Sequence, residues 1–261
     1  MKITRKFRTD RPLRTRGFSL MEMMIVIAIM FIVFAVVFES ANMFQQRGFA
    51  EVEKVDSVQS ARDFVDAVSR DIHDAGYPPA TITPQGFGTP TCVSNPNVAC
   101  GIVYYTPLKI QYEGDLDGTG TVYTVTLELV SGPNGTCPCL LRRGVIQKAL
   151  ALNGAQPTYY TEVNGVLNSG NWAGSATYPV SLPGSGSYSS YGTADVFAGY
   201  ANDGTQITAT CTPPSPCGTQ TMTIRELRVT ANVAPNFADP QLHTFPVFSI
   251  TSKARLSNVS P

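Results

Sequence analysis

An unbroken apolar stretch near the N-terminus constrains this chain more than any other feature. Residues 18–38 read FSLMEMMIVIAIMFIVFAVVF and contain a single charged side chain, that of Glu22. As an α-helix with a rise of about 1.5 Å per residue, this stretch would extend about 30 Å, the thickness of the hydrocarbon core of a bilayer. We therefore expect residues 18–38 to form a transmembrane helix.

Charge is distributed unevenly around this stretch. The chain is formally neutral, with 19 basic and 19 acidic residues, which gives no indication of nucleic-acid binding. Residues 1–17, however, carry seven basic side chains and one acidic side chain, a net charge of +6. By the positive-inside rule, we expect this leader to stay in the cytoplasm and the bulk of the chain to be exported from the inner membrane.

Three interpretations of the N-terminus compete. A secretory signal peptide has a shorter apolar core that ends in small residues, whereas this stretch is long and ends in FAVVFES. A plain single-span anchor leaves Glu22 unexplained. The third interpretation uses the segment GFSLME, which resembles the type IV prepilin signature: a glycine, an apolar aromatic residue and a glutamate fifth after the glycine. This resemblance implies that a prepilin peptidase cleaves after Gly17 and methylates the amine of Phe18.

The resemblance also gives Glu22 a role. An ionised carboxylate inside a membrane costs roughly 2.5–3.5 kcal/mol even on insertion scales, so such residues usually have a partner. Cleavage would free a positive amine on Phe18, one helical turn away, and the amine of a neighbouring subunit could also pair with Glu22 in a fibre. We expect Glu22 to act in filament assembly. The alternative is a glutamate at the membrane edge without a partner.

Beyond the apolar stretch, the sequence predicts that the same helix continues. Apolar residues recur at steps of three and four, which indicates one helical stripe. The stripe comprises Val52, Val55, Val58, Ala61, Val65, Val68, Ile72 and Ala75. No proline occurs between Pro12 and Pro78, so we expect one helix over residues 18–76 that ends at Gly76, a residue suited to a left-handed cap.

The end of this helix carries a second resemblance. Its sequence RDIHDAGY is similar to the helix-end motif of PilW-like minor pilins, R-D-[IL]-R-x-A-G-Y, with His73 in place of the second arginine. The matching residues are Arg70, Asp71, Ala75, Gly76 and Tyr77. Together the two resemblances imply a PilW-like minor pilin. Its partners would be the prepilin peptidase, the inner membrane and other pilins that pack against its N-terminal helix, before it reaches a cell-surface pilus.

Residues 77–261 have the pattern of a β-rich exported domain. Residues 121–130 alternate between apolar and polar side chains, as a half-buried strand does. Further strands are expected at residues 102–105, 108–112, 227–233 and 245–251. We therefore predict the α+β class, with the long helix packed on an antiparallel sheet. Residues 153–220, rich in Gly, Ser, Thr, Asn and Tyr, are expected to form a loop-rich insertion.

All six cysteines lie on the expected exported side, which favours disulfides. They are Cys92, Cys100, Cys137, Cys139, Cys211 and Cys217. The first two and the last two are close enough in sequence to close small loops. A bridge between the two cysteines of C-P-C would span one residue and would be strained. These two cysteines can therefore pair with each other or with separate partners. A zinc site is the alternative, but C-P-C is not the usual C-x₂-C.

One acidic segment, DLDGTG, separates two expected strands. We expect a hairpin turn there, with a calcium loop as the alternative. The EF-hand spacing is not met, because its third acidic position is Thr119 and no glutamate follows at the twelfth. No catalytic constellation stands out, and GSGS at residues 184–187 is not a G-x-S-x-G elbow. We therefore expect no enzymatic activity, cofactor or metal.

These features favour a minor pilin that initiates or supports pilus assembly near the tip. A minor pseudopilin of a type II secretion system is the first alternative, since it shares the leader, the helix and the α+β plan. A pilus-displayed adhesin or ligand-binding subunit is the second, and residues 153–220 would then hold its binding surface. An anchored exported enzyme is the least favoured, because no site is visible.

Overall fold

The computed structural model describes residues 17–78, 91–132, 139–168, 194–208, 223–235 and 245–257. Its elements in chain order are α1 (Leu20–Asp74), α2 (Thr91–Ser94), β1 (Ile102–Thr106), β2 (Lys109–Gly114), β3 (Tyr123–Val130), β4 (Cys139–Gln147), α3 (Lys148–Leu152), β5 (Thr158–Val166), β6 (Phe197–Tyr200), β7 (Glu226–Val233) and β8 (Phe248–Arg255). The chain divides into two units, Met1–Gln46 and Arg47–Pro261, and each is described by itself.

The first unit contains the N-terminal part of α1. The helix begins at Leu20, two residues after the expected start, and the Ser19 carbonyl accepts hydrogen bonds from the backbone N–H groups of Glu22 and Met23. Every described residue up to Gln46 is exposed, including the whole apolar stretch. A helix that is apolar on all faces is stable only when lipid or other protein surrounds it.

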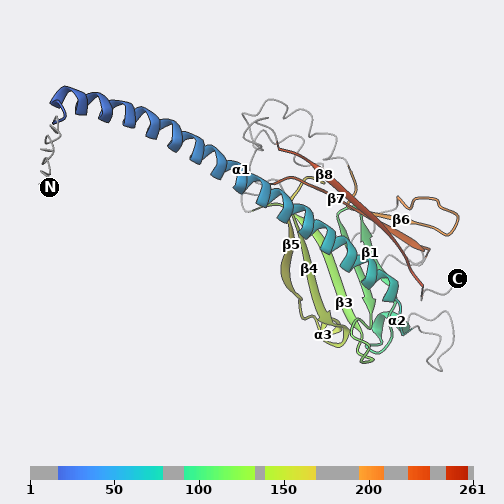
Figure 1. Ribbon diagram of the computed structural model, residues 1–261. Coiled ribbons are helices and arrows are strands. Elements are labelled where there is room, and N and C mark those ends of the chain that lie inside the picture. Colours follow the sequence, from blue (N-terminus) through green and yellow to red (C-terminus); the bar gives the residue numbers. More distant parts are fainter. Residues whose placement is uncertain are drawn as a thin grey trace, which may run out of the picture. The chain divides into compact units, whose positions relative to one another are not determined.

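The second unit contains an antiparallel sheet of eight strands in the order β1-β2-β3-β4-β5-β7-β6, with β8 paired to β7. Figure 1 shows β3, β4 and β5 side by side, and β7 beside β8. The eight residues of β8 pair with all eight of β7, from Glu226↔Arg255 to Val233↔Phe248. The other edge of β7 pairs with β6 and, through Val233↔Val166, with the end of β5. The predicted α+β class, with its antiparallel sheet, is confirmed.

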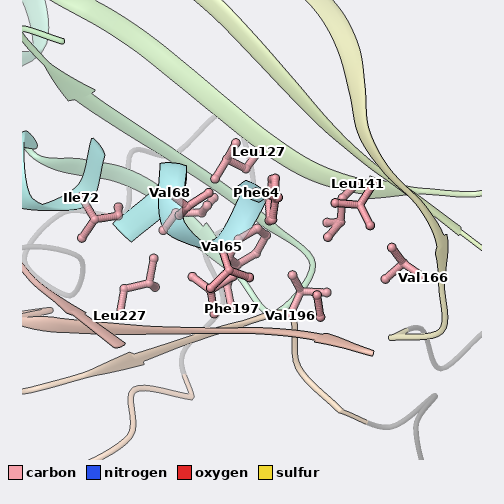
Figure 2. Close-up of a cluster of buried hydrophobic side chains, with 14 of the residues drawn as sticks. Phe64, Val65, Val68, Ile72, Leu127, Leu141, Val166, Val196, Phe197 and Leu227 are labelled. Carbon is pink, nitrogen blue, oxygen red and sulfur yellow. The ribbon is translucent and has the colours of Figure 1, made fainter. Parts of the chain in front are cut away.

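The core of this unit forms around the second half of α1. Ala61, Phe64, Val65, Val68 and Ile72 are its buried residues. Figure 2 shows four of them, Phe64, Val65, Val68 and Ile72, between Leu127 and Leu141, from β3 and β4, and Leu227, from β7. The helix therefore buries one stripe against strands on both sides, and burial of each large apolar side chain is worth about 1.5–3 kcal/mol.

The strand predictions succeeded where apolar and polar residues alternate. Residues 121–130 form β3 as Tyr123–Val130, and β1, β2 and β7 match their expected ranges to within two residues. The last strand is Phe248–Arg255, later than the expected 245–251. The predicted hairpin turn joins β2 to β3, whose register runs from Lys109↔Glu128 to Gly114↔Tyr123.

Two expectations need correction. The buried stripe starts at Ala61 and includes Phe64, whereas Val52 and Val55 are 59% and 61% exposed. Residues 153–220 are not loops throughout, because β5 and β6 lie within them and contribute buried side chains such as Val163 and Phe197. Composition predicted loops there because glycine and polar residues on the outward face of a strand resemble loop sequence. The rest of that segment lies mostly outside the described residues.

Candidate functional site

The head of α1 holds the residues expected to be processed. Gly17 and Phe18 precede the helix, and Phe18 is 76% exposed. A Cβ built on Gly17 would meet no atom within 4 Å, and its backbone is not in the left-handed region. The fold of this chain therefore does not require glycine at this position.

Glu22 lies in the first turn of α1. Its carboxylate accepts a hydrogen bond from the backbone N–H of Ser19, with an Oε2···N distance of 3.4 Å. This bond is one half of a capping box, in which a side chain three residues into a helix satisfies a free backbone donor. The bond thus holds the carboxylate at the positive end of the helix dipole.

The same part of α1 is strongly hydrophobic. The helix is long and apolar enough to cross a membrane, and the residues that make it so are not buried by the chain. Exposed apolar side chains continue past the expected span, at Met43, Phe44 and Phe49. This surface can be covered by lipid and by other helices.

The end of α1 is fixed to β2 by its backbone. Gly76 has a φ of 84°, so the predicted left-handed cap is present, and its N–H donates to the carbonyl of Glu113 at 2.8 Å. Ala75 is fully buried and pairs with Gly114 as an isolated bridge. A Cβ on Gly114 would lie 3.0 Å from the carbonyl oxygen of Asp74. The helix end and the strand are therefore in closest contact at a glycine.

Asp71, the acidic residue of the helix-end motif, joins α1 to two strands. Its Oδ2 accepts a hydrogen bond from the hydroxyl of Tyr112 on β2 at 2.8 Å. The same oxygen is 2.5 Å from Nη2 of Arg143 on β4. Burial, followed by the charge of Asp71, raises the pKa of Tyr112 well above its ordinary value, so this phenol stays protonated and donates. Asp71 thus has a structural role at the helix end.

The other motif residues lie at the surface or in the turn. The Arg70 side chain donates from Nε to the carbonyl of Asp66 at 3.4 Å and is exposed. His73 contacts Ser257 through Nε2 at 3.0 Å. Tyr77 is 48% exposed, and its carbonyl accepts from the N–H of Asp115 at 2.9 Å. Of the side chains in the motif, Asp71 makes the clearest connection to the sheet.

A buried ion pair, missed by sequence reasoning, supports the same region. Nζ of Lys148 lies 2.6 Å from Oε2 of Glu113 and donates to the carbonyls of Cys92 and Val98. The same carboxylate oxygen accepts from the N–H of Cys100 at 3.0 Å. Burial raises the pKa of Glu113, although the nearby ammonium opposes this. The pair therefore holds a loop against β2.

Disulfides account for each of the three cysteines among the described residues. Cys92 and Cys100 form one of the local bridges that the sequence allowed, and Cys139 is also disulfide-bonded. Cys137, Cys211 and Cys217 lie outside the described residues, as does most of the basic leader. The expectation of disulfide bonding on this side of the span is therefore confirmed for the part that the structure describes.

Comparison with known proteins identifies the N-terminal segment alone. Residues 13–38 match the family model described as the prokaryotic N-terminal methylation motif. No curated protein and no solved structure matches the chain. The matched residues contain Gly17, Phe18 and Glu22, and they include the exposed apolar part of α1. The match supports a type IV prepilin-like protein, with a structural role like that of a pilin or pseudopilin.

Proposed function

We propose that this protein is a minor pilin, cut by a prepilin peptidase after Gly17, methylated on Phe18 and assembled into a type IV pilus. The observation that carries the proposal is the methylation motif over residues 13–38, at the head of a helix whose apolar side chains the chain leaves exposed. Cleavage would remove the basic leader and leave Phe18 as the first residue. The mature helix would then be free to leave the membrane for a fibre.

Glu22 supplies the specific contact in this proposal. In the free subunit its carboxylate is held by the N–H of Ser19 at 3.4 Å, a weak bond that a stronger partner can replace. The positive amine of a neighbouring subunit is such a partner, because it carries a full positive charge, whereas the N–H of Ser19 carries only a partial one. Pairing would neutralise the carboxylate in an apolar fibre core, where an unpaired charge is costly.

We place the subunit near the tip of the fibre, in few copies, but below the apex. Its part beyond residue 76 has 185 residues, larger than a repeating shaft subunit usually needs. A subunit at the apex would have no neighbour above it to offer an amine to Glu22. The helix end is fixed to the sheet through Asp71, Tyr112 and Arg143, which suits a subunit that transmits force from its helix to its globular part.

Processing can be tested by mass spectrometry of the mature protein. We expect an N-methylated Phe18 at its N-terminus and an uncut leader in Gly17→Val. Gly48→Val is the matched control, because a Cβ at either glycine meets no atom within 4 Å and only the first lies at the expected cleavage site. A mature N-terminus at Met1, or beyond Phe38, would contradict the proposal.

Assembly can be tested by the ratio of this subunit in sheared fibres to that in membranes. We expect Glu22→Ala and Glu22→Gln to keep leader cleavage but to lower this ratio at least tenfold, about 1.4 kcal/mol of assembly free energy. Glu39→Gln, in the same helix after the apolar stretch, should leave it unchanged. An unchanged ratio in both Glu22 variants would contradict the pairing, and an abundance equal to that of the shaft subunit would contradict the low-copy role.

The same features fit a minor pseudopilin of a type II secretion system, and a deletion strain separates the two. Loss of surface pili with normal secretion of exoproteins would support the pilin. Loss of secretion with normal pili would instead assign the subunit to the secretion system. Neither outcome bears on cleavage after Gly17 or methylation of Phe18, which mass spectrometry tests separately.

A further inference from the structure

The loop of residues 91–101, which includes α2, connects the end of α1 to strand β2. The N–H of Ala99 donates to the carbonyl of Pro78, just past the helix, with an N···O distance of 3.0 Å. The carbonyl of Gly101 accepts a hydrogen bond from the N–H of Glu113 on β2 at 2.8 Å. A change in this loop can therefore reach the helix end directly.

The loop is held by the buried ammonium group of Lys148. This side chain is 1% exposed, and its Nζ donates to Oε2 of Glu113 at 2.6 Å, to the carbonyl of Val98 at 2.8 Å and to the carbonyl of Cys92. The same oxygen of Glu113 accepts from the N–H of Cys100 at 3.0 Å. Apart from the ion pair itself, these hydrogen bonds are all made by the loop, so the loop satisfies two buried charges.

The disulfide joins the two ends of the loop at this ammonium group. Cys92 and Cys100 are eight residues apart in sequence, and Nζ of Lys148 lies 3.8 Å from Sγ of Cys100. Residues 93–97 between them are exposed or half-buried, so apolar packing does little to keep the two ends together. Without the cross-link, the ends of the loop would separate more easily from the ion pair. Its charges would then lose their neutral partners, which is costly for buried groups.

Glu113 links the ion pair to the cap of α1. Its carboxylate contacts Lys148, whereas its backbone carbonyl accepts the hydrogen bond from the N–H of Gly76 at 2.8 Å. One residue of β2 thus joins the loop, the buried charges and the helix cap. Water that enters to solvate the charges would move this residue, and with it the acceptor on which the cap depends.

We propose that the Cys92–Cys100 disulfide is a redox lock on the end of α1. Its formation seats the loop on Lys148 and Glu113 and keeps the N–H of Gly76 on β2, and its reduction releases both. Closure is a two-electron oxidation, in which the two thiols pass two protons and two electrons to the disulfide of an oxidoreductase. That partner leaves as a dithiol, after exchange through a mixed disulfide. A reduced chain would have an intact sheet and a loose helix end, whether or not its leader is cleaved.

Hydrogen exchange of the full chain in detergent, read by mass spectrometry, tests the lock. Amide protection is compared at Gly76 in the cap and at Leu129 in β3, whose N–H donates to the carbonyl of Leu108 at 2.8 Å. We expect the double variant Cys92→Ser, Cys100→Ser to lower the protection of Gly76 at least about tenfold more than that of Leu129, because the cap opens locally. An equal fall at the two amides, or no fall at Gly76, would overturn the proposal.

A thermodynamic cycle shows whether the buried ion pair carries the coupling. Glu113→Gln together with Lys148→Met replaces the pair by neutral side chains of similar size. In that background, loss of the disulfide should lower the protection of Gly76, relative to Leu129, by less than about threefold. An equal effect in both backgrounds would overturn the proposal, because closure of the loop alone would then explain the behaviour of the wild type.

Graded reduction of the wild type gives the same test without a variant. Alkylated peptides report the reduced fraction of each disulfide, so the Cys92–Cys100 bridge is followed separately from the bridge at Cys139. We expect the protection of Gly76 to fall in step with reduction of the Cys92–Cys100 bridge and to return on reoxidation. A fall that follows the bridge at Cys139 instead would overturn the proposal.

Discussion

The two halves of α1 make opposite use of hydrophobic residues. From residue 18 to residue 46 they occur on every face, and the chain buries none of them. From Ala61 to Ile72 they form one stripe, and the side chains of that stripe are at most 3% exposed. A helix that is apolar on every face needs lipid or other apolar helices around it, whereas an amphipathic helix can bury its single apolar stripe against one sheet.

This difference shows where the chain depends on other molecules. The buried stripe contributes to the stability of the second unit, and its loss should be visible in the isolated subunit. The exposed half contributes nothing to that core, so changes there should appear only in a membrane or a fibre.

Phe64→Ala should destabilise the protein most. The side chain is 3% exposed, and removal of a buried phenylalanine leaves a cavity that costs about 3–5 kcal/mol. Phe49→Ala, at a side chain that is 72% exposed, should change the free energy of unfolding by less than about 0.5 kcal/mol. Denaturant unfolding of both purified variants measures the difference, and similar losses would contradict the division of the helix.

Arg143→Met should have the next largest effect. It leaves the Asp71 carboxylate, whose side chain is 17% exposed, without its cation, and we expect a loss of about 2–3 kcal/mol. The double variant with Asp71→Asn should recover part of this loss, because no charge then remains unpaired. A double variant as unstable as the sum of the two single variants would show that the contact does not join α1 to β4.

Gly114→Ala should cost about 1–3 kcal/mol, because the added methyl group meets the backbone of Asp74 and Ala75 at 3.0–3.3 Å. The matched change in the helix has the opposite sign. Gly48→Ala meets no atom within 4 Å and should stabilise the helix by about 0.5–1 kcal/mol. Thermal unfolding of the two variants compares them, and a loss in Gly48→Ala would show that the helix makes a close contact at that point.

The smallest expected effect is on the loss of stability in acid, through Glu128 on the outer face of the sheet. Burial raises the pKa of Glu128, but hydrogen bonds from Lys109 and Arg142 outweigh it, and the pKa lies below the ordinary 4.5. The carboxylate therefore contributes stability above pH 4.5, which is lost as the pH falls through the folded-state pKa. Glu128→Gln should reduce the acid-induced loss of stability by about 1 kcal/mol or less, and the free energy of unfolding of both proteins as a function of pH measures the difference.

Some elements of this molecule could be predicted from the sequence because their sequence patterns are local. The apolar run, the glycine cap at Gly76 and the alternation in β3 each depend on neighbours a few residues away. Strand β4 gave no such signal, because Arg142 and Arg143 are adjacent in a run that also contains Leu140 and Leu141. Which of the two arginines faces α1 depends on the register of β3 and β4.

Long-range packing also determined how much of the apolar stripe of α1 is buried. Spacing alone extended it back to Val52, since helical periodicity shows which residues share a face but not how far a partner surface extends. The stripe is fully buried only from Ala61 onward, whereas Val58 is half-buried and Val52 and Val55 are exposed. Likewise the buried partners Glu113 and Lys148 are 35 residues apart, and no local pattern relates them.

The sequence by itself determined the membrane-length helix, its prepilin-like head, the cap that ends it and the α+β class, because each follows from periodicity, composition or a short motif. The tertiary structure alone decided that Asp71 meets Tyr112 and Arg143 and that Lys148 meets Glu113. Those facts depend on strands that pair across long stretches of chain. The free energy of such contacts is set by burial and geometry, which only the folded chain defines.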